Sequence, residues 1–351
     1  MNLENCIISK YNNIFYYNRF GHGKHILLCE KLEKLYGYKA CLFPSGMSAI
    51  STGLSIMLMS NNWSKTNILY SNELYCDTPR TIKYLSENFI NLNQVVINVE
   101  DDENIMKIVN DIDKSIPTIF FIESCSNPNA KIFNFDLLKQ IKKKIPNIKI
   151  IIDNTWLTSI VFNPFSFQEV DMVVISMTKY YGAGNSGIMG AVISRNEMLA
   201  NKIFDYGRIM GLHVSPIYCK QILKNLENMS ERLKKSSNLT LQIAKYLESK
   251  DIQVNYPLLD SHSSYNKAIK YFNNGLGPSV LTFKIKKSKK AALKWMRKSN
   301  LECSTSFGGS HSKFDQWPIS SEGYTTCRLS IGYNDSYESL IKEFENMFSY
   351  I

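Results

Sequence analysis

The chain has 351 residues, of which 44% are hydrophobic and 21% are charged, and its formal net charge is +10. This balance excludes a disordered chain, and the length predicts two domains or one large α/β unit with an addition. No apolar run reaches the ~18 residues of a membrane span, and Met1–Lys10 lacks a signal-peptide core, so we expect a cytoplasmic protein without membrane contact.

Apolar runs alternate with helical patterns through the middle of the chain. We predict strands at Asn67–Tyr70, Gln94–Val99, Thr118–Ile122, Ile148–Ile152, Val170–Ile175 and Ile188–Ser194. Helices are predicted at Ser48–Met59, Thr78–Asn88, Ile105–Ile112 and Phe135–Lys144. This alternation is typical of a parallel sheet in an α/β domain.

The flanking regions show different patterns. Residues 1–40 offer little pattern before Ile26–Tyr36, which predicts an N-terminal arm. The segment Pro216–Ser249 predicts one long helix that leads to a second unit. After it come strand patterns at Ser279–Ile285 and Cys327–Gly332 and helical patterns at Lys289–Ser299 and Ser336–Phe348. We therefore divide the chain into an arm (1–40), a large α/β domain (41–249) and a small α+β domain (250–351).

Three classes of site are disfavoured by spacing. The eight cysteines and five histidines form neither a CxxC pair nor an HExxH segment, so we predict no metal site. The glycines at 182–187 match GxGxxG, but a strand rather than a helix is predicted after them, unlike in a dinucleotide fingerprint. The lysines are spread along the chain without an aromatic stacking platform, which favours a solvated basic surface over nucleic-acid binding.

Two strands end in residues suited to one kind of chemistry. The apolar run at 170–175 leads to Ser176, Thr178 and Lys179, at the strand end where open α/β sheets bind ligands. A lysine at such a place fits an amine that forms a Schiff base. Asp153 ends another apolar strand and could pair with a protonated pyridine nitrogen, although an aspartate there more commonly caps a helix or turn.

A third feature completes the set. Ser45-Gly46-Met47-Ser48 precedes a helical pattern, whose first N–H groups could bind a phosphate. A Schiff-base lysine, a partner for a pyridine nitrogen and a phosphate site are the three needs of pyridoxal 5′-phosphate (PLP). The residues alone thus indicate a PLP enzyme.

Nine ordered segments carry a resemblance. They are YNRFG at 17–21, PSGMSAI at 44–50, LYCDTPR at 74–80, ESCSNPNAKIFN at 123–134, IIDNTWL at 151–157, SMTKYYG at 176–182, NYPLLDSH at 255–262, SFGG at 306–309 and CRLSIG at 327–332. With them the chain resembles the Cys/Met-metabolism family of PLP enzymes, which contains cystathionine γ-synthase, cystathionine lyases, methionine γ-lyase and homoserine sulfhydrylases. The resemblance implies an α/β fold of the aspartate aminotransferase-like type (fold type I), with a large mixed-sheet domain and a small α+β C-terminal domain. It also implies a homo-oligomer, built as a dimer of dimers.

The resemblance implies roles position by position. Lys179 would bind PLP covalently and move protons, Asp153 would keep the ring nitrogen protonated, and Tyr75 would stack on the ring and act as acid or base. The phosphate would be bound by Gly46, Met47, Ser176 and Thr178 and, from a neighbouring subunit, by Tyr17 and Arg19. An amino-acid substrate would contact Arg328, Asn127, Ser306 and Arg80, with Arg328 binding the α-carboxylate. Without these motifs, we would interpret Tyr75 as a half-buried aromatic residue at a strand end and Arg328 as a member of a surface ion pair.

The departures from the family pattern surround the substrate pocket. His22-Gly23 stands where Asn-Pro is usual, the loop at 183–186 has no histidine, and only Ser310–Cys327 separates SFGG from Arg328. They therefore bear on the substrate rather than on the cofactor.

Two positions bear on the reaction. Asp77 stands where methionine γ-lyases typically have a cysteine, and Arg80 matches an arginine of the cystathionine-handling branch. We therefore expect γ-replacement on an O-activated homoserine, as in cystathionine γ-synthase. A cystathionine β- or γ-lyase, a related C–S lyase and a specialised biosynthetic γ-elimination or γ-substitution enzyme remain alternatives. A non-catalytic nucleic-acid-binding or structural relic is disfavoured, because Lys179, Asp153, Tyr75 and Arg328 are all present.

Overall fold

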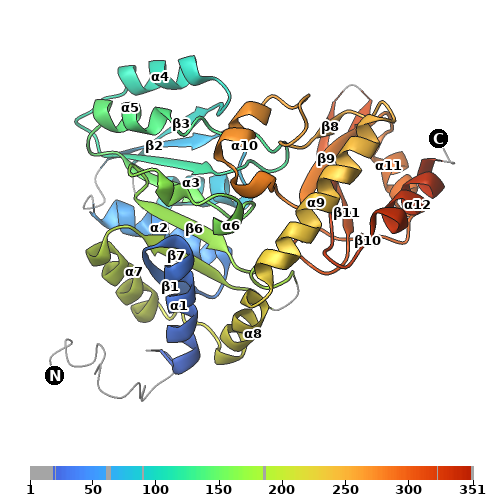
Figure 1. Ribbon diagram of the computed structural model, residues 1–351. Coiled ribbons are helices and arrows are strands. Elements are labelled where there is room, and N and C mark those ends of the chain that lie inside the picture. Colours follow the sequence, from blue (N-terminus) through green and yellow to red (C-terminus); the bar gives the residue numbers. More distant parts are fainter. Residues whose placement is uncertain are drawn as a thin grey trace.

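Two β-sheets organise the chain in the computed structural model, which describes residues 19, 21–60, 65–88, 91–184, 187–321 and 323–348 (Figure 1). The first sheet has seven strands in the order β1-β7-β6-β5-β4-β2-β3. Their bounds are β1 Lys39–Phe43, β2 Thr66–Ser71, β3 Leu92–Ile97, β4 Thr118–Glu123, β5 Lys149–Asp153, β6 Met172–Ser176 and β7 Gly190–Ser194. Neighbouring strands from β3 to β6 are parallel, while β7 is antiparallel to both β6 and β1, so the sheet is mixed.

Helices cover both faces of this sheet, because its strands are apolar on both sides. In β4, Ile119 and Phe121 join one core, while Phe120 and Ile122 join the other. The first core packs under α2 (Gly46–Ser60), α3 (Asp77–Asn88) and α7 (Glu197–Ile209). The second packs under α1 (Gly23–Tyr36), α4 (Asp102–Asp111), α5 (Leu137–Lys144) and α8 (Pro216–Leu226), with the short helices α6 (Thr158–Val161) and η2 (Pro164–Ser166) nearby.

The second sheet has five strands in the order β10-β11-β12-β9-β8. Its strands are β8 Val254–Asn255, β9 Val280–Ile285, β10 Glu302–Cys303, β11 Lys313–Ser321 and β12 Tyr324–Ser330. The helices in this part of the chain are α10 Tyr265–Tyr271, η3 Asn273–Gly275, α11 Lys289–Met296 and α12 Tyr337–Phe348. One face is apolar: Phe283 and Phe314, whose ring centroids lie 5.8 Å apart, pack with Trp295 and Phe344. The opposite face carries Arg328 and Asp315, which are cross-strand partners.

Helix α9 (Met229–Glu248) connects the two sheets (Figure 1). Its 20 residues span about 30 Å, and it contacts α8 at one end and β8, β9 and α12 further on. The single long helix predicted over Pro216–Ser249 is therefore wrong: the structure has two helices, α8 and α9. They separate at Asn228, whose side chain accepts a hydrogen bond from Arg232 Nε at 2.9 Å, while Arg232 Nη2 donates to the Asn225 carbonyl at 2.7 Å.

The division at residues 40 and 249 stays a prediction. Within the segment predicted as an arm, residues 23–36 form α1, which packs on β1 and α8, and residues 39–40 begin β1. No helix in the described part of the chain has both the length and the apolar character that a membrane span requires. Searched over the same residues, no cluster of three or more metal-ligating side chains is present.

Candidate active site

The carboxyl ends of β4, β5 and β6 lie side by side and carry polar side chains. Glu123 is the last residue of β4 and is the register partner of Asp153, the last residue of β5. Ser176 ends β6, the next parallel strand, and pairs with Gly190 of β7. The two strand ends chosen from the sequence, at Asp153 and Ser176, are therefore adjacent, and Glu123 is an addition that the sequence analysis missed.

Lys179 lies in the turn that follows β6 and is partly buried. Its Nζ lies 5.1 Å from the ring centroid of Phe307, which belongs to the SFGG segment. Burial, followed by the positive charges of Arg328 and Lys313, lowers the pKa of Lys179 to about 8. An amine with this pKa loses its proton far more readily than a surface lysine, which suits a nucleophile.

Asp153 is buried and is held by its neighbours. Its Oδ1 accepts hydrogen bonds from the Thr155 N–H at 2.9 Å and from the Thr155 hydroxyl at 2.6 Å. Thr155 Oγ1 in turn accepts the Ser176 N–H at 2.8 Å, which ties the end of β5 to the end of β6. Burial raises the pKa of Asp153 to about 6, while the hydrogen bonds from Thr155 oppose that rise.

The N-terminus of α2 packs closely against the ends of β6 and β7. The Ser48 N–H donates to Ser45 Oγ at 2.9 Å, which caps the helix. A Cβ at Gly46 would lie 2.7 Å from Ser176 Cβ, so only glycine fits there. The first N–H groups of α2 therefore lie next to Ser176, a placement that suits a phosphate. Thr178 is already engaged, since its Oγ1 donates to the Met189 carbonyl at 3.3 Å and accepts the Met189 N–H at 3.2 Å.

Tyr75 and Asn127 lie in the loops after β2 and β4, and Glu123 binds both. Glu123 Oε1 accepts the Tyr75 N–H at 2.6 Å, and Oε2 accepts the Asn127 N–H at 3.2 Å. The Tyr75 side chain is 41% exposed, whereas Asn127 is buried. Burial, together with Asp77 and Cys76, raises the pKa of Tyr75, and Arg328 opposes that rise.

Arg328 brings the second sheet into the site. It is buried on β12, and its Nη1 donates to Asn127 Oδ1 at 3.4 Å. Its Nη2 donates to the Thr305 carbonyl and to Asp315 Oδ2, the latter at 3.2 Å. Asp315 was not predicted, because no strand was predicted between 310 and 326.

The SFGG segment closes against the lysine turn. A Cβ at Gly308 would lie 2.7 Å from the Tyr180 backbone nitrogen, and one at Gly184 would lie 2.7 Å from Gly309 Cα. The Ser306 carbonyl accepts a hydrogen bond from Ser330 Oγ at 3.1 Å. Ser306 therefore lies beside the strand of Arg328 and next to Phe307, in the same part of the site.

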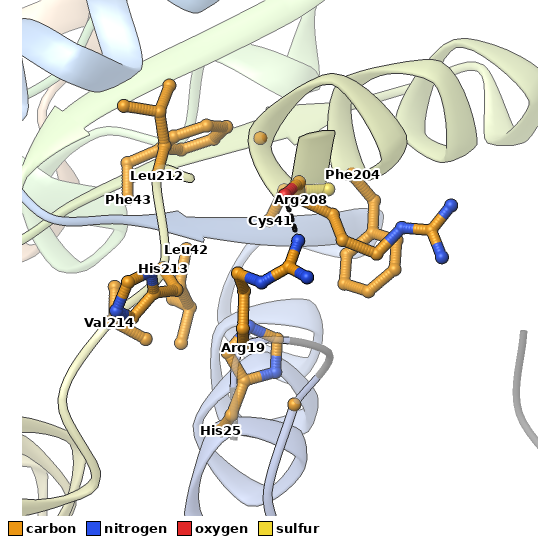
Figure 2. Close-up of a pocket in the computed structure, with 12 residues that line it drawn as sticks. Arg19, His25, Cys41, Leu42, Phe43, Phe204, Arg208, Leu212, His213 and Val214 are labelled. Atoms are coloured by element: carbon orange, nitrogen blue, oxygen red, sulfur yellow. Dashed lines mark hydrogen bonds between the residues drawn. The ribbon is translucent and has the colours of Figure 1, made fainter. Parts of the chain in front are cut away.

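Three predicted residues remain, namely Arg80, which is exposed, Arg19, which lines a small cavity, and Tyr17, which lies outside the described residues. Arg80 is 75% exposed and forms an ion pair with Asp77 at 2.8 Å, at the rim beside Tyr75. Arg19 Nη1 donates to the Arg208 carbonyl at 3.3 Å, and Figure 2 shows it in a cavity between α1, β1 and α7. That cavity holds only about 30 Å³, far too little for a cofactor.

The chain is similar in sequence to curated cystathionine lyases and synthases. A Schizosaccharomyces pombe cystathionine beta-lyase is 28% identical over 273 residues, covering 77% of this chain and 67% of its own. A Haemophilus influenzae cystathionine gamma-synthase is 26% identical over 236 residues, covering 67% of this chain and 61% of its own. The chain spans 53–67% of the length of the first curated relatives it matches.

Solved structures match over most of the chain. A Campylobacter jejuni protein described as an O-acetylhomoserine (thiol)-lyase, crystallised with N′-pyridoxyl-lysine-5′-monophosphate, has a TM-score of 0.83 and 25% identity, covering 94% of this chain and 87% of its own. A cystathionine gamma synthase of Xanthomonas oryzae pv. oryzae, in complex with cystathionine, has the same TM-score of 0.83 at 22% identity, covering 97% and 90%. These likenesses confirm the expected α/β architecture of fold type I.

A family model matches most of the chain. The model described as "Cys/Met metabolism PLP-dependent enzyme" matches residues 2–322. This range contains Lys179, Asp153 and the α2 N-terminus. The chain therefore belongs to the Cys/Met metabolism PLP-dependent enzyme family.

Proposed function

We propose that this enzyme catalyses γ-replacement on an O-activated homoserine, in the manner of a cystathionine γ-synthase. The convergence of Lys179 after β6, Asp153 on β5 and Arg328 on β12 supports chemistry on an amino acid bound to PLP. The preference for γ-replacement rests on Asp77 and Arg80, which form an ion pair beside Tyr75.

The residues present fit PLP. The site has the Lys179 amine of lowered pKa and the buried Asp153 carboxylate at a strand end. It also has the N-terminus of α2, where a side chain at Gly46 would clash with Ser176. When bound, PLP supplies an electron sink for the bonds at the substrate α-carbon.

Each residue has a task in this proposal. Lys179 would hold the cofactor, and its free amine would take and return protons at the α- and β-carbons; a pKa of about 8 allows both proton transfers near neutral pH. Asp153 would be the partner of the ring nitrogen and would keep it protonated. The α2 N-terminus, with Gly46, Met47 and Ser176, would hold the phosphate; Thr178 would join them only by giving up its hydrogen bond to the Met189 carbonyl.

Arg328 and Tyr75 act on the substrate rather than on the cofactor. Arg328 binds the α-carboxylate, and its contacts to Asn127 and to the Thr305 carbonyl keep the guanidinium in one orientation. Asp315 shares this guanidinium, so a substrate carboxylate binds beside it or displaces it. Tyr75 is protonated at neutral pH, as any tyrosine of ordinary or raised pKa is, and it donates that proton to a leaving group.

A second candidate is a lyase acting on cystathionine. It is favoured by the S. pombe relative, which is described as a cystathionine beta-lyase. β-Elimination by such a lyase also needs fewer steps from the same residues. Arg80, exposed at the rim beside Tyr75, is offered in both cases as a contact for a distal carboxylate.

A product assay separates the two candidates. O-acetyl-, O-succinyl- and O-phosphohomoserine and cystathionine are each incubated with the PLP-loaded enzyme, with and without cysteine, and keto acid and thioether are measured. Thioether formed only with cysteine supports γ-replacement, while keto acid from cystathionine without cysteine supports the lyase. Lys179→Ala is the control, and turnover by that variant equal to the wild type would contradict the proposal.

A further inference from the structure

Two loops at the site, those after β2 and β4, are joined by two carboxylates, Glu73 and Glu123, each of which binds groups of the other loop. Glu123, at the end of β4, accepts the backbone N–H of Tyr75, which lies in the loop after β2, and the N–H of Asn127 in its own loop. From the β2 side, Glu73 accepts the Ser126 hydroxyl at 2.8 Å and the Asn129 side-chain amide at 2.9 Å. The loops at 72–76 and 124–131 thus hold each other in register.

The two carboxylates differ in what surrounds them. Glu73 is partly exposed, and it also forms an ion pair with Lys131 at 3.0 Å. Glu123 is 7% exposed, and no cation is among its hydrogen-bond partners in the described structure. Burial, and then the charge of Asp153 on the next strand, raises the pKa of Glu123 well above its ordinary range. A carboxyl group in such a place is costly unless its oxygens accept hydrogen bonds, and here each oxygen accepts one.

The partners of Glu123 are the residues whose relative position matters most. Tyr75 is the proposed proton donor, and Asn127 contacts Arg328, the proposed carboxylate-binding residue. One carboxyl group therefore sets the distance between the group that moves a proton and the group that holds the substrate. A shift of about 1 Å in such an arrangement costs roughly 100-fold in rate.

We propose that Glu123 is a positioning residue that fixes Tyr75 relative to the Asn127–Arg328 pair. It acts through the two backbone N–H groups and touches neither the substrate nor the reacting atoms. Glu123 thus adds to the proposed function, on which this inference rests, a residue that controls the geometry of the acid–base step.

The first test is a double-mutant cycle with Tyr75. Glu123→Gln keeps the size of the side chain but turns one acceptor into a donor, which faces an N–H group and loses one of the two hydrogen bonds. We expect kcat to fall at least tenfold in the wild-type background and less than twofold in a Tyr75→Phe background, because the misplaced hydroxyl is already absent. An equal loss of kcat in both backgrounds would overturn the proposal.

The second test needs no turnover. In the cofactor-free protein, hydrogen–deuterium exchange of Glu123→Gln should be faster in at least one of the peptides covering 72–76 and 125–131 and unchanged elsewhere, since the N–H group that faces the new amide NH2 loses its acceptor. Unchanged exchange in these two loops would also overturn it. If Glu123→Gln does not fold, Glu123→Asp serves both tests, because it withdraws the carboxyl group by one methylene.

A matched control is Asp171, which lies at the amino ends of β5 and β6, whereas Glu123 lies at the carboxyl ends of the strands. Asp171 accepts the Ile150 N–H at 2.9 Å and pairs with Lys142 at 2.7 Å, so it also holds a neighbouring strand through a backbone N–H. Asp171→Asn should keep kcat/KM within twofold and leave exchange in both loops unchanged; a kcat loss like that of Glu123→Gln would mean that the effect is general. An absence of wild-type turnover would count against the proposed function alone, because the exchange experiment still tests Glu123.

Discussion

Lys179 is the residue whose surroundings do most to set its chemistry. Its pKa falls to about 8 because of burial, and then because of Arg328 and Lys313. The unfolded chain holds this proton up to about 10.5, the ordinary value. The buried charge therefore lowers stability fully below pH 8, and this penalty is relieved as the pH rises from about 8 to 10.5.

The shift can be measured on the cofactor-free protein. Competitive labelling with acetic anhydride across pH, followed by peptide mapping, should give Lys179 a midpoint near 8, well below that of surface lysines. Arg328→Met removes the nearby positive charge that lowers the pKa of Lys179 most, so the midpoint should move upward. A midpoint near 10.5 in the wild type, or no change in Arg328→Met, would contradict this account of the site.

The sequence allowed Lys179 and Asp153 to be found because each follows an apolar run that ends at a sheet edge. The same signal was present at Glu123, where TIFFI is followed by a carboxylate, but nothing in the sequence says that β4 and β5 are neighbours. Asp315 could not be found, because its position depends on strand pairing between β11 and β12. The roles assigned to all these residues remain proposals.

At the scale of elements, the glycine with the least room for a side chain, among those described, is Gly190, where β7 meets the turn that begins α2. A Cβ at Gly190 would lie 2.2 Å from the Ser45 carbonyl oxygen and 2.8 Å from Gly46 Cα. Both are backbone atoms and cannot move aside cheaply, so the turn at the proposed phosphate site has no room for a side chain on β7.

Gly190→Ala should therefore cost about 1–3 kcal/mol in the free energy of unfolding, measured by urea denaturation of the cofactor-free protein. It should also weaken PLP binding, measured by absorbance titration, because the α2 N-terminus must shift. Gly207→Ala in α7 is the control: its Cβ would meet the ring edge of Phe43 at 3.1 Å, and alanine favours a helix interior by about 1 kcal/mol. Equal stability and PLP affinity in Gly190→Ala and the wild type would contradict the close packing.

Elements were predicted best where burial alone decides them. The six strands predicted in the middle of the chain all overlap strands of the seven-stranded sheet, because each is an apolar run. The division between α8 and α9 was missed, since both helices keep an apolar face and only the side-chain contacts of Arg232 mark the break. β11 was missed because KFDQWPISS neither alternates regularly between polar and apolar residues nor forms an apolar run, and it contains a proline.

At the scale of the whole molecule, the proposed oligomer has a direct test. We propose that Tyr17 and Arg19 complete the phosphate site of a neighbouring subunit. Arg19→Ala and Lys179→Ala should then each be nearly inactive, while a reassociated equal mixture recovers activity. In a mixed dimer one site collects both defects and the other neither, so roughly a quarter of all sites should be restored. Activity is measured after subunit exchange has been confirmed by mass spectrometry.

Each single variant serves as its own control when it is reassociated with itself. No recovery in the mixture, with both variants folded, would mean that Arg19 acts within its own subunit. Its contact with the Arg208 carbonyl in this structure would then be its working position (Figure 2).

The contact between Arg328 and Asn127 joins residues 201 positions apart, and it bears on how the protein is made. The seven strands of the first sheet have all been synthesised by Ser194, so we expect that sheet to fold on the ribosome while the rest of the chain is still being translated. Arg328 arrives on β12, well over a hundred residues later. Until then the Asn127 loop lacks its partner on β12, so we expect that a substrate carboxylate cannot be held before β12 has been made.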